Sequence, residues 1–276
     1  MIRSFARHLV DSWAPAFGLA YRRLRDYRAV RRPAVPTPFG FTLAGNATLA
    51  AGHFEKDEID IFIEYLQKAS ICIDVGANIG LYTCLAASRG KQVVAVEPLS
   101  SNLDLLYKNL IRNGLLNVEV FPLGLAAGSG IRRLFGAQTG ASFLPGWADT
   151  SERYCTVVPV NTLDAIVGTR FDGLPLLIKM DVEGFETEVL EGAKYTLELN
   201  PKPVWMVEIC LNQHHPGGLN NRFRETFEFF WRYGYHAVVA EPGQRPVDRD
   251  DVIRWAKQGA VDFGSHNYVF LEGAPC

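Results

Sequence analysis

The chain has 276 residues, of which 48% are hydrophobic and 21% are charged, and its formal net charge is −2. This length suits one large domain with a well-buried core or two small ones, and the composition is ordinary for a soluble globular protein. A net charge close to zero gives no general reason to expect nucleic acid as a partner.

The charge is unevenly placed along the chain. Residues 1–32 contain eight arginines against Asp11 and Asp26, a local balance of +6 that leaves −8 on the remaining residues. This segment lacks the uninterrupted apolar core of a signal peptide, and no later apolar run reaches membrane-spanning length. We therefore expect no transmembrane segment. The arginine-rich arm is interpreted as a solvated or packed helix, with peripheral contact to a membrane or a partner as the alternative.

The five cysteines are scattered along the chain and never form a CxxC pair. An odd number of cysteines without such pairs indicates free thiols in a reducing compartment. The sequence thus predicts a cytoplasmic protein.

The first third of the chain divides near residue 52. Residues 30–52 are punctuated by Pro and Gly without a sustained hydrophobic period, which is typical of a linker or a short hairpin. Apolar residues at helical spacing then predict a helix over 57–69 with Asp57 as its N-cap. We expect a basic extension and linker over 1–52 and a single domain over 53–276.

From residue 71 onward, strand and helix patterns alternate. The predicted strands cover 71–75, 93–96 and 118–123, with one helix over 81–88 and another that opens with the capping box Ser101-x-x-Asp104. Such alternation implies right-handed βαβ units and a mostly parallel sheet that is buried on both faces.

Residues 126–160 break this rhythm. They are rich in Gly, Ser and Thr and end in a β-like run over 155–160, so we interpret them as an insertion with its own hairpin at the mouth of a site. The later predicted strands cover 176–180 and 204–209, with closing strands over 235–240 and 268–271. A short helix is predicted over 163–167, behind Thr162. Two longer helices follow, and their inward residues are Val182, Phe185, Val189, Leu190 and Ala193 in the first and Phe223, Phe227, Phe230 and Trp231 in the second.

The first strand ends in the stretch IDVGANIG. Asp74 is followed by Gly76, Asn78 and Gly80, which lead into a helix. Glycines let the backbone approach a ligand closely, and a helix N-terminus offers free N–H groups. Because ligands of an open parallel sheet bind beyond the carboxyl ends of its strands, this turn is a candidate ligand site.

The second strand ends at Glu97, whose carboxylate can accept hydrogen bonds from both hydroxyls of a ribose. The turn lacks the dinucleotide pattern G-x-G-x-x-G, because Asn78 stands where its second glycine is needed. A nucleoside without a phosphate at this turn fits better, and S-adenosylmethionine is the common one.

Several stretches together resemble the FkbM-type methyltransferases: IDVGANIGLYT, the acid of VVAVEP, the segment PVNTLD and IKMDVEGFETEVLEG. The resemblance covers roughly residues 52–210 and extends more weakly to the C-terminus. It implies a Rossmann-like class I methyltransferase fold with a mostly parallel seven-stranded sheet and helices on both faces. It also implies transfer of a methyl group from S-adenosylmethionine to a hydroxyl, and the similar segment GHFEKDE implies that Glu55 lies over the cofactor.

Three residues are candidates for the general base of this transfer. Asp181 follows the strand over 176–180, and Glu208 lies at the end of the next strand. The third candidate is either His214 or His215, which both lie in the loop beyond that strand. A carboxylate or histidine within hydrogen-bond reach removes the proton of an alcohol as the new bond forms. Lys179, a charge in a buried strand, is expected to pair with Asp181 or another strand-end acid.

These acids also have structural interpretations. Asp181 could cap the following helix, with Glu183 and Glu186 in its first turn. Glu188 and Glu191 are interpreted as a solvated helix face. Acids together with His214 could also bind Mg²⁺, but no ligand spacing is diagnostic, and we predict no metal site.

The predicted function is an S-adenosylmethionine-dependent O-methyltransferase that acts on a hydroxyl of a sugar, glycan or polyketide-like small molecule. A non-catalytic Rossmann-like binding module is the alternative. A nicotinamide-dependent oxidoreductase is disfavoured by the missing middle glycine and by the lack of an obvious Tyr-x-x-x-Lys pair. A nucleic-acid methyltransferase is disfavoured because DVEG stands where base-modifying enzymes often carry an N-P-P-Y-like segment. We therefore expect no nucleic-acid partner.

Overall fold

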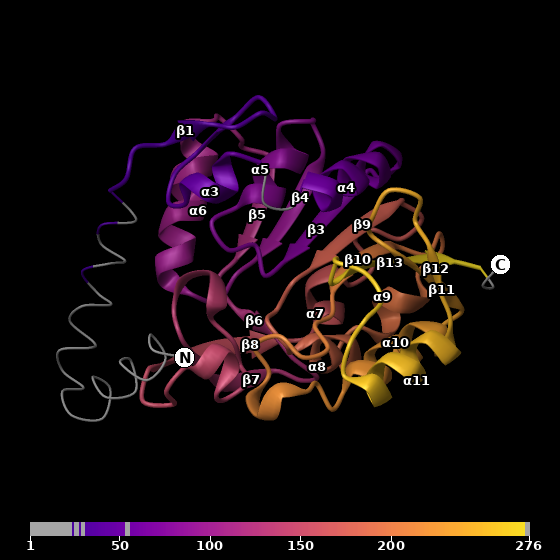
Figure 1. Ribbon diagram of the computed structural model, residues 1–276. Coiled ribbons are helices and arrows are strands. Elements are labelled where there is room, and N and C mark those ends of the chain that lie inside the picture. The colour runs from indigo at the N-terminus through magenta and orange to yellow at the C-terminus, as the bar shows by residue number, and fades with distance from the viewer. Residues whose placement is uncertain (1–23, 25–27, 29–30, 53–55, 274–276) are drawn as a thin grey trace.

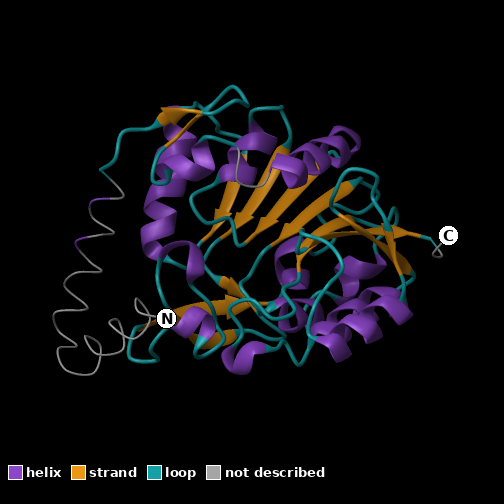
Figure 2. Ribbon diagram, viewed as in Figure 1, coloured by secondary structure: helices purple, strands orange, loops and turns teal. Residues whose placement is uncertain are grey.

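A central eight-stranded sheet organises the computed structural model, which describes residues 24, 28, 31–52 and 56–273 (Figure 2). Its order is β12-β11-β13-β10-β9-β3-β4-β5, and all pairs from β10 to β5 are parallel. The strands are β3 (Ile71–Val75), β4 (Gln92–Val96), β5 (Val118–Phe121), β9 (Leu176–Met180), β10 (Val204–Glu208), β11 (Tyr235–Val239), β12 (Pro246–Val247) and β13 (Asn267–Glu272). The mostly parallel sheet is confirmed, and the two-residue β12 adds an eighth strand that the sequence did not predict.

Helices cover both faces of this sheet (Figure 1). One face carries α4 (Lys56–Lys68), α5 (Leu81–Ala87) and α6 (Ser100–Arg112), and the other carries α7 (Leu163–Val167), α8 (Glu186–Glu191), α9 (Lys194–Glu198), α10 (Phe223–Arg232) and α11 (Arg249–Gln258). Ile71, Ile73 and Val75 pack with the second group of helices, whereas Cys72 packs with the first. Since side chains alternate along a strand, burial on both faces makes β3 a continuous apolar run.

The short segments before the sheet pack onto α6. β1 (Val35–Pro36) and β2 (Thr42–Leu43) form an antiparallel pair followed by α3 (Ala47–Ala50), so the hairpin expected within 30–52 is present. The side chain of Asn109 accepts a hydrogen bond from Ala44 N at 2.8 Å and donates to Ile79 O at 2.8 Å. Phe41 and Leu43 are buried in the same core as α4, α5 and α6. The domain boundary at residue 52 stays a prediction.

A second, three-stranded sheet lies beside the main one and is built from β6 (Gly124–Leu125), β7 (Gly130–Phe135) and β8 (Cys155–Asn161) (Figure 1). β7 and β8 are antiparallel, which gives the predicted hairpin. The loop that joins them carries the short 3₁₀ turns Gln138–Gly140 and Trp147–Asp149. This β7–β8 loop, residues 136–154, reaches the ends of β3 and β9.

Two predicted helix caps are wrong. Helix α6 begins at Ser100, and its N-cap Leu99 makes no side-chain capping bond, so Ser101 and Asp104 form no capping box. The reason is that the Glu97 carboxylate already accepts a hydrogen bond from Leu99 N at 2.8 Å and fixes the chain before the helix. Similarly, Asp57 is the second residue of α4 rather than its cap.

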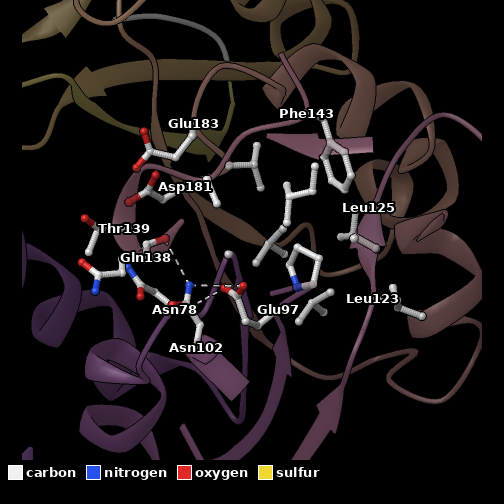
Figure 3. A pocket seen from close by; sticks show the side chains of 18 residues that line it. Asn78, Glu97, Asn102, Leu123, Leu125, Gln138, Thr139, Phe143, Asp181 and Glu183 are labelled. Carbon is white, nitrogen blue, oxygen red and sulfur yellow. Dashed lines mark hydrogen bonds between the residues drawn. The ribbon is translucent and has the colours of Figure 1, made fainter. Parts of the chain in front are cut away.

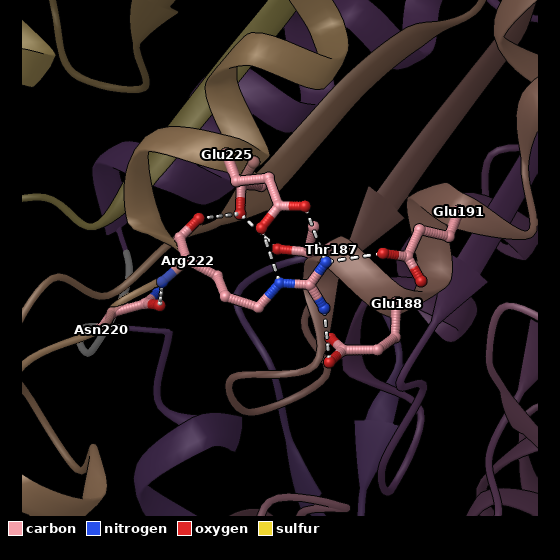
Figure 4. Close-up of polar contacts among 7 residues, drawn as sticks. Thr187, Glu188, Glu191, Asn220, Arg222 and Glu225 are labelled. Carbon is pink, nitrogen blue, oxygen red and sulfur yellow. Dashed lines mark hydrogen bonds and ion pairs between the residues drawn. The ribbon is translucent and has the colours of Figure 1, made fainter.

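Helix α8 is held to α10 by a cluster of ion pairs around Arg222 (Figure 4). The Arg222 guanidinium lies 2.6 Å from a carboxylate oxygen of Glu188, 2.6 Å from one of Glu191 and 2.8 Å from one of Glu225. Glu188 and Glu191 are 25% and 34% exposed, so they lie on a partly solvated helix face and also pair with Arg222. Because a six-residue helix is not stable alone, this cluster helps to fix the segment that follows β9.

No helix in the described part of the chain is both long enough and apolar enough to span a membrane.

Candidate active site

The turns after β3 and β9 touch each other. Gly76 has a φ of +82°, and a Cβ there would lie 1.8 Å from the carbonyl oxygen of Asp181, so only glycine fits. Gly80 also has a positive φ, and a Cβ there would lie 2.4 Å from Leu106 Cδ1. Gly76 lines both cavities described below, whereas Gly80 lines neither and serves the packing of α5 on α6.

Glu97 forms the polar end of a narrow cavity beyond β3 and β4 (Figure 3). Its carboxylate accepts hydrogen bonds from Asn78 N at 2.8 Å, from Leu99 N at 2.8 Å and from Asn102 Nδ2 at 3.3 Å. Burial raises the pKa of Glu97 to about 7, against the lowering effect of these three donors. Asn102 also donates to Gln138 O at 3.3 Å, which ties the β7–β8 loop to the cavity.

The narrow cavity has the groups that a nucleoside requires. Leu123, Leu125 and Phe143 supply an apolar wall, and Glu97 supplies the hydroxyl acceptor (Figure 3). The Oδ1 atom of Asn78 is buried without a hydrogen-bond partner, which is an open acceptor for a ligand. These residues fit S-adenosylmethionine, with its adenosine in the narrow cavity.

A large cavity of about 610 Å³ adjoins the narrow one. This volume lies within the roughly 300–1,000 Å³ of small-molecule sites. Five residues line both cavities: Gly76, Asn78, Thr139, Asp181 and Glu183. A ligand in the large cavity would therefore meet a nucleoside ligand beside Asp181.

Asp181 directly follows β9, and its N–H donates to Val75 O at 3.0 Å. Helix α8 begins only at Glu186, with Phe185 as its N-cap, so the interpretation of Asp181 as a helix cap is wrong. The Asp181 side chain is 34% exposed, and its carboxylate lies 4.0 Å from the buried Lys179 ammonium. This contact confirms the predicted pairing of Lys179 with a strand-end acid, and Lys179 also donates to Asn267 Oδ1 at 3.2 Å.

Glu183 is held to the β7–β8 loop by two hydrogen bonds. The indole of Trp147, which is only 2% exposed, donates to Glu183 Oε2 at 2.7 Å, and Ser142 Oγ donates to Glu183 O at 2.6 Å. Burial, together with the charge of Asp181, raises the pKa of Glu183 to about 9. At Gly184, whose φ is +91°, a Cβ would lie 2.5 Å from the Trp147 ring. Trp147 therefore anchors the loop.

The other two candidate bases lie on the same large cavity. Glu208, at the end of β10, is within hydrogen-bonding reach of Asp181, and burial and the Asp181 charge raise its pKa well above the usual range. His214 has a φ of +64°, and its ring centroid lies 5.8 Å from that of Trp147. His215 packs edge-on against Trp147 at 4.6 Å, and burial lowers its pKa to about 4. His215 does not line the cavity.

The remaining predicted residues have different places. Asp74 lines the large cavity and accepts a hydrogen bond from Thr83 Oγ1 at 2.5 Å, and burial raises its pKa to about 6. Glu186 is 3% exposed and accepts from Gly184 N at 3.0 Å, which is a structural contact. Glu55 lies outside the described residues.

Sequence reasoning missed two residues on the wall of the large cavity, Glu58 on α4 and His266 before β13. Glu58 ends the segment GHFEKDE, in which only Glu55 was predicted to lie at the site, and His266 comes from a segment far in sequence from the predicted motifs. Among the side chains that the structure describes, no group of three or more His, Cys, Asp and Glu is arranged to hold a metal ion.

Comparison with known proteins identifies the family of this chain. The model of the methyltransferase FkbM domain matches residues 74–237. A hexuronic acid methyltransferase, AglP of Haloferax volcanii, is 27% identical over 190 residues, which cover 64% of this chain and 77% of the relative.

Solved structures resemble the chain at a lower level. A putative O-methyltransferase from Klebsiella pneumoniae has a TM-score of 0.45 and 12% identity, over 97% of this chain and 95% of that one. An O-methyltransferase from Bacillus cereus, in complex with SAH, has a TM-score of 0.42 and 14% identity, over 81% of this chain and 84% of that one. Since both scores are below 0.5, the assignment depends on the family match, which spans more than half of the residues. The chain belongs to the FkbM family of S-adenosylmethionine-dependent methyltransferases.

Proposed function

We propose that the protein transfers the methyl group of S-adenosylmethionine to a hydroxyl of a sugar, glycan or polyketide-like small molecule. The observation that carries this proposal is the position of Asp181, which lines both the narrow cavity and the large cavity. A partly exposed carboxylate at this junction can contact an acceptor hydroxyl beside the cofactor. The similarity to a hexuronic acid methyltransferase supports a carbohydrate acceptor.

Three residues would hold the cofactor. Glu97 would accept hydrogen bonds from the ribose hydroxyls, because its Oε2 atom accepts a hydrogen bond from the Asn78 N–H and a carboxylate oxygen has further lone pairs. Asn78 Oδ1 and the Asp74 carboxyl group, which both belong to residues of the large cavity wall, would bind the polar amino-acid part. When bound, the cofactor supplies a methyl group that its sulfonium activates.

The acceptor needs a base and a fixed orientation. Asp181 would accept the proton of the acceptor hydroxyl, while the Lys179 ammonium 4.0 Å away compensates the carboxylate charge. Glu208, which holds its proton because burial and Asp181 raise its pKa, would donate a hydrogen bond to Asp181 and orient it. The proton on Asp181 then passes to solvent, because this side chain is 34% exposed.

The experiment combines cofactor binding with turnover. Calorimetric titration with S-adenosylmethionine, S-adenosylhomocysteine and NADH tests the donor, and binding of NADH alone would contradict the proposal. Asp181→Asn should keep the affinity for S-adenosylhomocysteine and lower kcat by about 10²–10⁴-fold, as expected for a lost general base. Glu208→Gln and His214→Asn are the matched variants. Normal turnover of Asp181→Asn with loss in one of these would move the base to that residue.

We propose a small-molecule acceptor rather than nucleic acid. The large cavity is lined by five carboxyl groups and by Lys179 as its one lysine or arginine among the described residues, which disfavours a phosphate backbone. Tight, salt-sensitive RNA binding in a filter assay would contradict this.

A cytoplasmic location is proposed from the cysteines, since Cys72, Cys84, Cys155 and Cys210 are free thiols.

A further inference from the structure

The large cavity has an uneven charge that the proposed transfer does not explain. Its described lining contains the carboxyl groups of Glu58, Asp74, Asp181, Glu183 and Glu208. Burial raises the pKa of Glu183 to about 9 and that of Glu208 well above its usual range, so the negative charge of the wall lies on the other three. The transfer uses one acid as a base and one or two to hold the cofactor. The acid on α4, Glu58, has no part in either task.

Lys179, the one lysine or arginine among the described residues of this wall, already has partners. Lys179 is 2% exposed, donates to Asn267 Oδ1 at 3.2 Å and lies 5.2 Å from the centre of the Tyr82 ring. Its Nζ also faces Asp181 at 4.0 Å. An anionic group of a ligand would therefore have to compete with these partners for Lys179.

Neutral polar side chains make up much of the remaining wall. Asn46, Thr48, Gln213 and Asn267 come from three different segments and line the same cavity. Amide and hydroxyl groups both donate and accept hydrogen bonds, as sugar hydroxyls do. The wall is thus suited to several hydroxyls but offers no cationic fork for a carboxylate or a phosphate.

We propose that the acceptor is a polyhydroxylated sugar that is neutral or carries an amino group, and that Glu58 excludes sugars that carry a carboxylate. This inference rests on the proposed function and specifies its substrate class, which it separates from that of the hexuronic acid methyltransferase relative. Like charges several ångströms apart in a half-enclosed site lower affinity on the order of tenfold per pair. An ammonium group in the same place has the opposite effect.

The position of Glu58 makes it the residue to test. Glu58 Oε1 accepts a hydrogen bond from Ser265 Oγ at 3.1 Å, and its negative charge acts on the neighbouring His266, whose pKa burial lowers. Its carboxylate is therefore held against the loop before β13, at the cavity wall. Replacing it by an amide removes the charge and keeps the size and the acceptor oxygen.

The experiment measures binding to the protein saturated with S-adenosylhomocysteine. The probes are the methyl glycosides of glucose, glucosamine and glucuronate, which share one ring and differ in charge. We expect the glucuronate to bind on the order of tenfold or more weakly than the glucoside, and the glucosaminide to bind at least as tightly as the glucoside. Binding of the amino sugar should release protons, seen as a dependence of the enthalpy on the buffer, because a cation favours ionisation of acids such as Asp74 and Glu183.

A matched pair of variants assigns the effect. Glu58→Gln should reduce the preference for glucoside over glucuronate severalfold, whereas Asp57→Asn, an exposed acid in the same first turn of α4, should leave it unchanged. Equal or tighter binding of the glucuronate by the wild-type protein, or binding of none of the three probes at millimolar concentration, would overturn the inference. Either result with intact S-adenosylhomocysteine binding leaves the proposed methyl transfer standing, whereas loss of cofactor binding would contradict the transfer itself.

Discussion

Replacement of Glu97 by glutamine is the sharpest test of the cofactor site. The Glu97 side chain is 4% exposed and accepts three hydrogen bonds, two of them from the backbone N–H groups of Asn78 and Leu99. The variant Glu97→Gln keeps the shape of the side chain but removes the charge and one acceptor. Alanine would instead leave three buried donors without partners, so it would confuse folding with binding.

The loss of affinity follows from the type of bond. A hydrogen bond to a charged group contributes about 1.5–3 kcal/mol, so Glu97→Gln should weaken S-adenosylhomocysteine binding by about 10- to 150-fold. The effect should depend on pH. Burial raises the pKa of Glu97 to about 7, and donors from the ligand favour the ionised form, so wild-type affinity should rise with pH between about 6 and 8. The variant lacks this rise.

The pH dependence of folding stability has the opposite sign to that of ligand binding. Because the folded-state pKa of Glu97 is raised, the folded protein holds more protons than the unfolded chain between about pH 4.5 and 7, and this carboxyl group costs stability as pH rises through that window. The cost is at most about 3 kcal/mol and is constant above the folded-state pKa. The stability deficit of Glu97→Gln relative to wild type should therefore shrink as pH increases.

The assay is calorimetric titration with S-adenosylhomocysteine from pH 5.5 to 8.5, with urea unfolding at the same pH values. Asp104→Asn, an exposed acid on α6, is the control and should leave both curves unchanged. If Glu97→Gln bound the ligand with wild-type affinity and wild-type pH dependence, Glu97 would not contact the cofactor, and the nucleoside assignment of the narrow cavity would fail.

Three further changes test how the site is held together. Trp147→Phe removes the 2.7 Å bond to Glu183, so we expect a loss of about 1–3 kcal/mol in the free energy of unfolding and a lower kcat, both measurable on purified protein; an unchanged kcat would separate the β7–β8 loop from catalysis. Gly76→Ala places a Cβ 1.8 Å from the Asp181 carbonyl oxygen and should cost at least about 3 kcal/mol or prevent folding, whereas normal urea unfolding would refute the contact. Arg222→Ala should cost only about 1 kcal/mol by urea unfolding, because its three ion pairs are partly exposed and screened; a loss of several kcal/mol would mean that the cluster is effectively buried.

The strands that position the site could be predicted from the sequence. The bounds of β3 and β9 agree with the predicted 71–75 and 176–180, because each is an apolar run that stops at a polar or glycine turn. The acids at the strand ends could be grouped for the same reason, since the carboxyl ends of parallel strands share one edge of the sheet. Glu97 and Asp181 lie at that edge, as the alternation predicts.

The turn after β9 could not be predicted in this way. A helical period over residues 182–193 suggested that the helix begins directly after Asp181, but Glu183 and Gly184 have positive φ and α8 begins later. This conformation depends on hydrogen bonds from Trp147 and Ser142, which lie 36 and 41 residues away from Glu183. A local pattern holds no information about such partners. The same limit applies to Glu58, whose contact with Ser265 joins residues 207 positions apart.

The two motifs that identify the family are parts of one contact. Gly76 in IDVGANIG was interpreted as a glycine that admits a ligand, yet the nearest obstacle to a side chain there is the Asp181 carbonyl of KMDVEG at 1.8 Å. The N–H of Asp181 donates to Val75 O at 3.0 Å, so a backbone hydrogen bond joins the ends of β3 and β9 where the two turns begin. Any side chain at position 76 would push Asp181 away from the junction of the cavities. The glycine therefore acts on the proposed base through the backbone, and the spacing of cofactor and acceptor depends on it as much as on the acids themselves.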